Sequence, residues 1–303
     1  IVFLSLYSIS LFYYFKTLDS NKISNILLFS LFAALATSIR IVGIFLPISV
    51  LFFGLINYFS QRKDLNIKII FINFLSYLIF LIIFWPLLWE NPIQNFLSYF
   101  EVLGDYFNSK VLFLGNYYYS NNLPYYYLVF WIYISTPIVH LIFFSTGFLY
   151  YSIKLMKRFF NIKKVSLYND LWRSNEEKKD FLIFLNLTIF LIFFTFMNVK
   201  MYNSWRMAYF LYIFIIYFAI YAIYILNIIA RRKKIKFKNK ISLMLITVFV
   251  LFSCYRIYLY HPYQSFYFNI FAKKNIKDTV DVDYTGLSGL HFLKEITDLE
   301  KDK

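Results

Sequence analysis

Two polar segments follow the last long apolar segment of the chain. The first reads His261-Pro-Tyr-Gln-Ser-Phe-Tyr-Phe-Asn269, and the second reads Asp281-Val-Asp-Tyr-Thr-Gly286. A chain that only crosses a bilayer needs none of these His, Gln, Asn and Asp side chains, which can hydrogen-bond a polar ligand or exchange a proton. They supply the first candidates for substrate contact: His261, Tyr263, Gln264, Tyr267, Asn269, Asp281, Asp283 and Tyr284. A purely structural role for both segments is the alternative.

A second set of candidates contains cations that can bind an anion. Arg40 lies between two short apolar halves, and Lys200 and Arg206 enclose the connection Lys200-Met-Tyr-Asn-Ser-Trp-Arg206. A guanidinium fork matches two phosphate oxygens, so we predict that Arg40, Lys200 and Arg206 bind a phosphate. Their neighbours Tyr202, Asn203 and Trp205 are predicted to face the substrate. The alternatives are an Arg40 side chain that reaches to the membrane surface and a connection that only joins two helices.

Carboxylates and metal ligands give a weaker signal. The segment Trp85-Pro-Leu-Leu-Trp-Glu-Asn-Pro92 ends an apolar run, as is typical of a helix end with aromatic anchors at the headgroup level. Glu90 or Asp105 can serve as a general base if a cleft raises the pKa of its carboxyl group. The three histidines are scattered, and no HExxH, CxxC or glycine-rich phosphate-loop pattern occurs. We therefore predict no cofactor and no nucleotide-binding domain, while a divalent metal ion stays open.

Membrane helices must position these residues. The 303-residue chain is 60% hydrophobic with a mean hydropathy of +0.59. Apolar runs of about 20 residues recur, which is enough to cross the hydrocarbon core of a bilayer, so the sequence predicts an all-α polytopic membrane protein. The net charge of +15 is concentrated in connections such as Arg231–Lys240, which alternate with cation-poor ones. This alternation follows the positive-inside rule and argues against a nucleic-acid partner.

The same alternation predicts the topology. It gives about eight transmembrane helices: Ile1–Phe15, Asn25–Ile39, Ile41–Ser60, Ile69–Leu88, Tyr125–Ile153, Phe181–Val199, Ala208–Ala230 and Ile241–Tyr260. The fifth can begin as an interfacial helix before Pro137. We expect a transmembrane domain at 1–260 with a trans-side loop at 89–124, followed by a trans-side C-terminal segment at 261–303 that contains a short amphipathic helix at Leu287–Leu299.

The order of the motifs resembles that of the membrane glycosyltransferases of GT-C fold. The motifs are Ser-Ile-Arg-Ile-Val-Gly at 38–43, the Trp-Pro motif at 85–92, Tyr-Tyr-Tyr at 125–127, Thr-Pro at 136–137, Tyr-Asn-Ser-Trp-Arg at 202–206 and the two tail segments. Within this group the chain most resembles the bacterial branch related to protein O-mannosyltransferases and lipid A aminoarabinose transferase. The resemblance covers most of the chain.

The resemblance implies transfer of a sugar from a polyprenyl-phosphate carrier to an acceptor on the periplasmic side of the bacterial inner membrane, in the cell envelope. It also implies a catalytic carboxylate in a loop between the first two spans. Because the chain begins with Ile1 inside an apolar run, we expect this loop to precede Ile1, so the sequence is an N-terminally truncated fragment and the catalytic acid is unknown. Met207 is a departure, since relatives often carry His there. The expected partners are membrane lipid, the donor and an unidentified acceptor.

Two other functions fit the same residues. A transporter or flippase for a lipid-linked sugar would use the same cations without a catalytic acid. Many transporters carry paired Gly- or Pro-broken helices, and the sequence shows no such pairing. A structural subunit of an envelope complex is the third hypothesis. The polar motifs clustered on one predicted side favour the enzyme.

Overall fold

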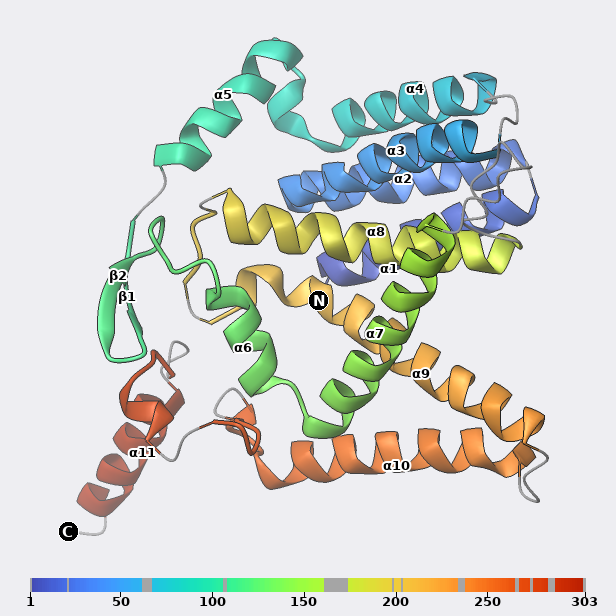
Figure 1. The fold of residues 1–303 in the computed structure, drawn as a ribbon. Coiled ribbons are helices and arrows are strands. Elements are labelled where there is room, and N and C mark those ends of the chain that lie inside the picture. The colour runs from blue at the N-terminus through green and yellow to red at the C-terminus, as the bar shows by residue number, and fades with distance from the viewer. Residues whose placement is uncertain are drawn as a thin grey trace. The chain divides into compact units, whose positions relative to one another are not determined.

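The fold comes from a computed structural model. The described residues are 2–20, 22–61, 67–105, 108–160, 174–197, 199–202, 204–233, 238–264, 267–272, 275–282 and 287–301. Helices account for most of them, which confirms the predicted all-α class (Figure 1). The chain forms two compact units. Unit 1 contains residues 1–107, 149–191 and 210–214, and unit 2 contains residues 108–148, 192–209 and 215–303.

The first half of the chain contains α1 (Val2–Asp19), α2 (Ile23–Ile39), the 3-10 turn η1 (Ile41–Ile44), α3 (Phe45–Gln61), α4 (Ile67–Phe84), the 3-10 turn η2 (Pro86–Leu88) and α5 (Pro92–Asp105). A hairpin of β1 (Lys110–Phe113) and β2 (Asn116–Tyr119) follows. The remaining elements are α6 (Tyr127–Ser135), α7 (Ile138–Phe160), α8 (Asn175–Phe196), the 3-10 turn η3 (Arg206–Leu211), α9 (Tyr212–Arg232), α10 (Lys238–Leu259), the 3-10 turn η5 (Ile276–Asp278) and α11 (Leu287–Lys301).

Within the described residues, three helical segments are long and apolar enough to cross a membrane. They are Ile138–Phe160, Asn175–Phe196 and Arg206–Arg232. Shorter apolar helices occupy Ile23–Ile39, Ile41–Ile56, Lys68–Phe84 and Leu243–Leu259. Each of the eight predicted spans contains helix in the part of the chain that the structure describes, and the fifth is two helices separated at Thr136-Pro137. The predicted number of eight membrane crossings is not confirmed, since three of the helical segments meet the length and hydropathy of a membrane span. The amphipathic helix predicted at Leu287–Leu299 is present as α11.

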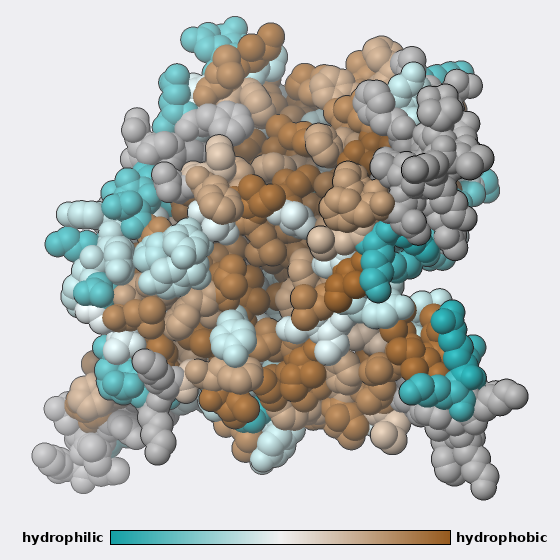
Figure 2. Space-filling model, in the orientation of Figure 1, coloured by the Kyte–Doolittle hydropathy of each residue, from teal (hydrophilic) through white to brown (hydrophobic). Residues whose placement is uncertain are grey.

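Apolar side chains cover much of the protein's surface. Figure 2 shows them over a large part of the visible face. In α10, Leu243, Met244 and Leu251 are all more than 60% exposed, although the helix is 22 residues long and rich in aliphatic residues. Water would penalise such a surface, whereas acyl chains would not. These exposed helices and the three long apolar segments support a membrane protein.

The segment 89–124, predicted as a loop, is folded. It contains α5 and the antiparallel β1–β2 hairpin, whose register pairs Lys110 with Tyr119 and Phe113 with Asn116. The hairpin reverses through Leu114 and Gly115, which both have a positive φ. Only four residues form each strand, so the alternating pattern is too short to stand out in the sequence.

Buried polar contacts join the helices of unit 1. The Tyr7 hydroxyl donates a hydrogen bond of 2.8 Å to the side-chain oxygen of Asn186 in α8. The Tyr77 hydroxyl of α4 donates one of 3.0 Å to the Thr37 hydroxyl of α2. Isolated polar pairs of this kind join apolar helices in membranes, where lipid offers no competing partner.

Two helices of unit 2 cross in backbone contact at Gly147. A Cβ at this residue of α7 would lie 2.0 Å from the carbonyl oxygen of Phe218 in α9. No side chain fits in that space, so glycine permits the close crossing.

Candidate functional site

The candidate site in unit 2 is built on the connection from α8 to η3. Met201 is buried, and its N–H donates a hydrogen bond of 3.1 Å to the carbonyl of Ser120 at the end of the hairpin. At the other end, the buried Trp205 donates its indole N–H to the Ser135 hydroxyl of α6, over 2.8 Å. Between them Ser204 adopts a positive φ of 61° and turns the chain into η3. The connection is therefore held at two points.

The cations of this connection lie in different environments. Lys200 is half-buried, whereas Arg206 is exposed at the first residue of η3. Among the described residues, no hydrogen bond or ion pair engages the Arg206 guanidinium. A 3-10 turn and α9 follow it directly, so the partial positive charge of a helix start adds to that of Arg206. Arg206 is available to an external anion. Tyr202 is half-buried, and Asn203 lies outside the described residues.

The break between α6 and α7 connects this site to the tail. Pro137 has no N–H, so the carbonyl of Tyr133 loses its normal helical partner four residues on. The buried Asn269 replaces it, because its amide donates hydrogen bonds to the carbonyls of Tyr133 (2.6 Å) and Thr136 (2.9 Å). The Asn269 backbone N–H also donates to the carbonyl of Ile134, over 2.8 Å. Asn269 therefore caps the C-terminal end of α6.

A second part of the tail extends the hairpin. Val280 forms an antiparallel bridge with Phe113 of β1. The backbone N–H of Asp281 donates to the carbonyl of Leu112, and the N–H of Leu112 donates to the Asp281 carboxylate, over 2.9 Å. On the other side of the bridge, the Gly115 N–H donates to Thr279. Asp281 thus holds the tail along β1, while the candidates Asp283 and Tyr284 lie outside the described residues.

The remaining tail candidates lie near the end of α10. His261 and Gln264 are exposed, and the Gln264 amide nitrogen lies 3.0 Å from Nδ1 of His261. Tyr263 is half-buried. The Tyr267 ring is buried and meets Tyr260 edge to face, at 5.1 Å between centroids.

Arg256 is a cation that the sequence reading missed. Its guanidinium lies over the rings of Phe252 (5.1 Å) and Tyr267 (5.6 Å). Burial raises the pKa of Tyr267, and the charge of Arg256 offsets part of that rise. An arginine inside the apolar run 241–260 was the available signal, because a charge in such a run is costly.

Arg40 belongs to unit 1 and stands at the junction of α2 and η1. It is half-buried, its guanidinium lies 5.8 Å from the Phe3 ring, and its extended backbone interrupts the helix. Gly43 lies so close to the backbone of Thr37 that a Cβ would approach within 2.5 Å. Glu90, a candidate base, is exposed at the start of the turn into α5.

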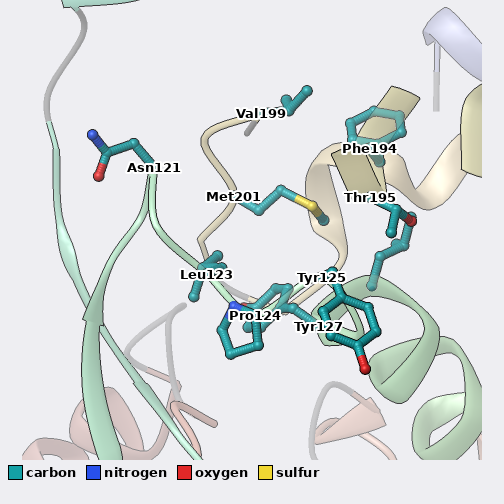
Figure 3. Close-up of a pocket in the computed structure, with 10 residues that line it drawn as sticks. Asn121, Leu123, Pro124, Tyr125, Tyr127, Phe194, Thr195, Val199 and Met201 are labelled. Carbon is teal, nitrogen blue, oxygen red and sulfur yellow. The ribbon is translucent and has the colours of Figure 1, made fainter. Parts of the chain in front are cut away.

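A small pocket opens beside the connection. Its lining comes from four places: the exit of the hairpin, the start of α6, the end of α8 and residues 199–201 (Figure 3). Asn121, Tyr125, Tyr127, Thr195 and Met201 are among the residues around it. It has room for about one water molecule, which is far less than a sugar ring needs. Within the described ranges, no group of three or more His, Cys, Asp or Glu could hold a metal ion.

Comparisons with known proteins add no information on the chemistry of this site. No family model, curated protein or solved structure matches this chain. The candidate site in unit 2 therefore consists of Lys200, Tyr202, Trp205 and Arg206, braced by α6, the hairpin and the tail.

Proposed function

We propose that the protein is a membrane glycosyltransferase that uses a polyprenyl-phosphate sugar. The observation that carries this proposal is the exposed Arg206 guanidinium at the start of an apolar segment long enough to cross a membrane. A cation at that depth meets lipid headgroups, and its fork suits the phosphate of a lipid carrier. The hydrogen bond from the Trp205 indole to Ser135 anchors the chain immediately before Arg206.

The reaction follows from the charge on the leaving group. An acceptor hydroxyl or amine attacks the anomeric carbon, the bond from that carbon to the phosphate oxygen breaks, and the polyprenyl phosphate leaves with the electron pair. A general base takes the acceptor proton. Arg206, with Lys200, stabilises the phosphate as its charge grows, which is the larger part of the catalysis. The base is not assigned, and Arg40 is a further candidate cation in unit 1.

The proposed topology places this chemistry on the trans side of the membrane. Eight crossings bring Arg206, the 89–124 segment and the tail to the side opposite the basic stretch 231–240. In this arrangement His261, Tyr263 and Gln264 are available to the acceptor side. Asn269 and Asp281 act through the elements they hold.

Binding of the carrier tests the proposal without requiring turnover. Purified protein in nanodiscs is titrated with polyprenyl monophosphate, and Arg206→Ala is compared with Arg231→Ala, which removes an exposed arginine from the opposite end of the same apolar segment. We expect Arg206→Ala to weaken binding by about 10- to 100-fold, as the loss of a charge-assisted hydrogen bond implies. Arg231→Ala should leave binding unchanged. Equal effects of the two substitutions would remove Arg206 from the site.

The fate of the sugar separates a transferase from a flippase. Proteoliposomes receive a polyprenyl phosphate that carries a radiolabelled sugar, together with an envelope extract that supplies acceptors. A transferase moves the label from the lipid fraction to an acceptor. A flippase changes the leaflet of the labelled lipid and leaves the sugar attached to it, and that result would replace the proposed reaction.

A further inference from the structure

Helix α5 carries an exposed apolar stripe. Ile93 and Leu97 are 78% and 60% exposed, and their spacing of four residues puts them on one side of α5. Trp89, in the non-helical turn that leads into α5, is 66% exposed. Exposed side chains of this size are costly in water when they lie together. The stripe therefore needs an apolar environment.

Contacts with Trp85 and Leu87 fix how α5 is rotated about its axis. Phe96 and Tyr99 pack edge to face on Trp85, with centroids 6.1 Å and 5.1 Å away, and Trp85 is buried. The Asn95 amide donates a hydrogen bond of 2.8 Å to the carbonyl of Leu87. These contacts hold α5 on the end of α4, so Ile93 and Leu97 cannot turn inward without breaking them.

Trp89 suits a boundary between water and hydrocarbon. Its indole N–H donates a hydrogen bond of 2.9 Å to the carbonyl of Ile82, so the single polar group of this exposed side chain has a partner. The ring can therefore enter an apolar layer at no cost in hydrogen bonds, and tryptophan is enriched at membrane interfaces.

The stripe continues an apolar surface on the preceding helix. Ile79, Ile82 and Ile83 of α4 are exposed, and Leu87 in η2 lies between them and the stripe. Figure 1 shows the chain changing direction between α4 and α5. A helix that crosses a bilayer and then turns would carry its apolar surface from the acyl chains into the interface.

The charge of this segment indicates which kind of membrane surface it can bind. From Trp89 to Asp105 the sequence contains Glu90, Glu101 and Asp105 and no Lys or Arg. Helices that bind anionic lipid use cations on their polar face, so this helix is unsuited to an anionic surface. Burial of the apolar stripe remains as the driving force.

We propose that α5 lies in the plane of the bilayer interface. Trp89, Ile93 and Leu97 enter the boundary between headgroups and acyl chains, by about 5–10 Å as is usual for such helices. Apolar burial holds the helix there without help from anionic headgroups. This interaction is independent of the proposed glycosyl transfer and would also hold in a transporter or a structural subunit.

Nitroxide labels measure the depth directly. In a Cys254→Ser background, single cysteines replace Ile93 and Leu97 on the stripe and Gln94 beside it, all three of which are exposed. The labelled proteins are reconstituted in phosphatidylcholine vesicles, and collision with oxygen is compared with collision with a water-soluble nickel complex. We expect a severalfold higher oxygen-to-nickel ratio at 93 and 97 than at 94. Added anionic lipid or 1 M salt should leave this ratio unchanged.

Three other results of the labelling experiment would each contradict the proposal. Nickel access at 93 and 97 equal to that at 94 would show that the stripe lies in water. Exclusion of both reagents from 93 and 97 would indicate a protein surface, such as a second copy of the chain. Dependence on anionic lipid would indicate an electrostatic anchor. Quenching of tryptophan emission by brominated phosphatidylcholine checks the protein without labels, because Trp89→Phe should remove part of the quenchable emission and would remove none if Trp89 lay in water.

Discussion

The side-chain amide of Asn269 donates a hydrogen bond of 2.6 Å to the carbonyl of Tyr133, in the place of the N–H that Pro137 lacks. The two residues are 136 positions apart in the chain. This hydrogen bond joins the tail to the end of α6, and Ser135 at the same end holds Trp205. One helix terminus thus supports both the tail and the connection that carries Arg206.

Removal of the Asn269 amide should destabilise the protein. Asn269→Ala leaves the carbonyls of Tyr133 and Thr136 buried without a donor, which we expect to cost about 2 kcal/mol. Thermal unfolding in detergent is the measurement. Asn269→Asp has the same shape and cannot donate when ionised, so it should be at least as harmful. Gln264→Ala, at an exposed position of the same tail, is the control, and a loss as large as that of Asn269→Ala would refute the role of the amide.

The contact between Trp205 and Ser135 should show energetic coupling. Trp205→Phe keeps an aromatic ring and removes the N–H, while Ser135→Ala removes the acceptor. The two single variants and the double variant form a cycle, in which we expect a coupling of about 1 kcal/mol in unfolding free energy. Strictly additive effects would mean that the hydrogen bond contributes nothing.

The shape of the cationic group at residue 206 should affect the affinity for polyprenyl monophosphate. Arg206→Lys keeps the cation and loses the two-pronged fork, so we expect affinity for polyprenyl monophosphate between that of the unchanged protein and that of Arg206→Ala. The same titration measures it. An affinity equal to that of Arg206→Ala would show that geometry decides binding, and one equal to that of arginine would show that charge alone suffices.

Backbone contact between α7 and α9 should not tolerate a side chain. Gly147→Ala places a Cβ 2.0 Å from the Phe218 carbonyl oxygen, so the helices must separate, and we expect a clear loss of thermal stability and of folded yield. Gly54→Ala is the matched control, because its Cβ would meet only the tip of Ile70 at 3.4 Å. Equal stability of the two variants would contradict the close crossing.

The apolar pattern predicted the helices, while the partners of single polar residues could not be predicted. Apolar runs located the long apolar helices because burial and lipid exposure both demand them, and Pro137 marked the break in the fifth, whereas α5 lies in a segment that was predicted as a loop. Asn269 was chosen as a substrate-facing candidate, since no local pattern reveals that its partners lie in α6. Trp85 and Trp89 seemed equivalent as membrane anchors, yet α5 covers Trp85 and leaves Trp89 exposed.

The site candidates also differ in how far the local sequence could predict them. Arg206 was predicted from its position next to an apolar run and is exposed there. The hydrogen bond of Trp205 to Ser135 and the isolated β-bridge of Val280 to Phe113 are tertiary contacts that span 70 and more than 160 residues. Short-range sequence patterns contain no information on contacts of that separation.

The extension of β1 by Val280 and Asp281 has a consequence for biosynthesis. A ribosome makes the hairpin long before it makes the segment that pairs with β1, since the Leu112–Asp281 contact spans 169 residues. Through that interval the outer edge of β1 has unpaired backbone groups, and α6 has an uncapped end. Both are completed by the same late segment. A polypeptide whose synthesis stops between α10 and Asn269 would keep these exposed groups, which gives membrane proteases and chaperones a way to distinguish an aborted chain from a finished one.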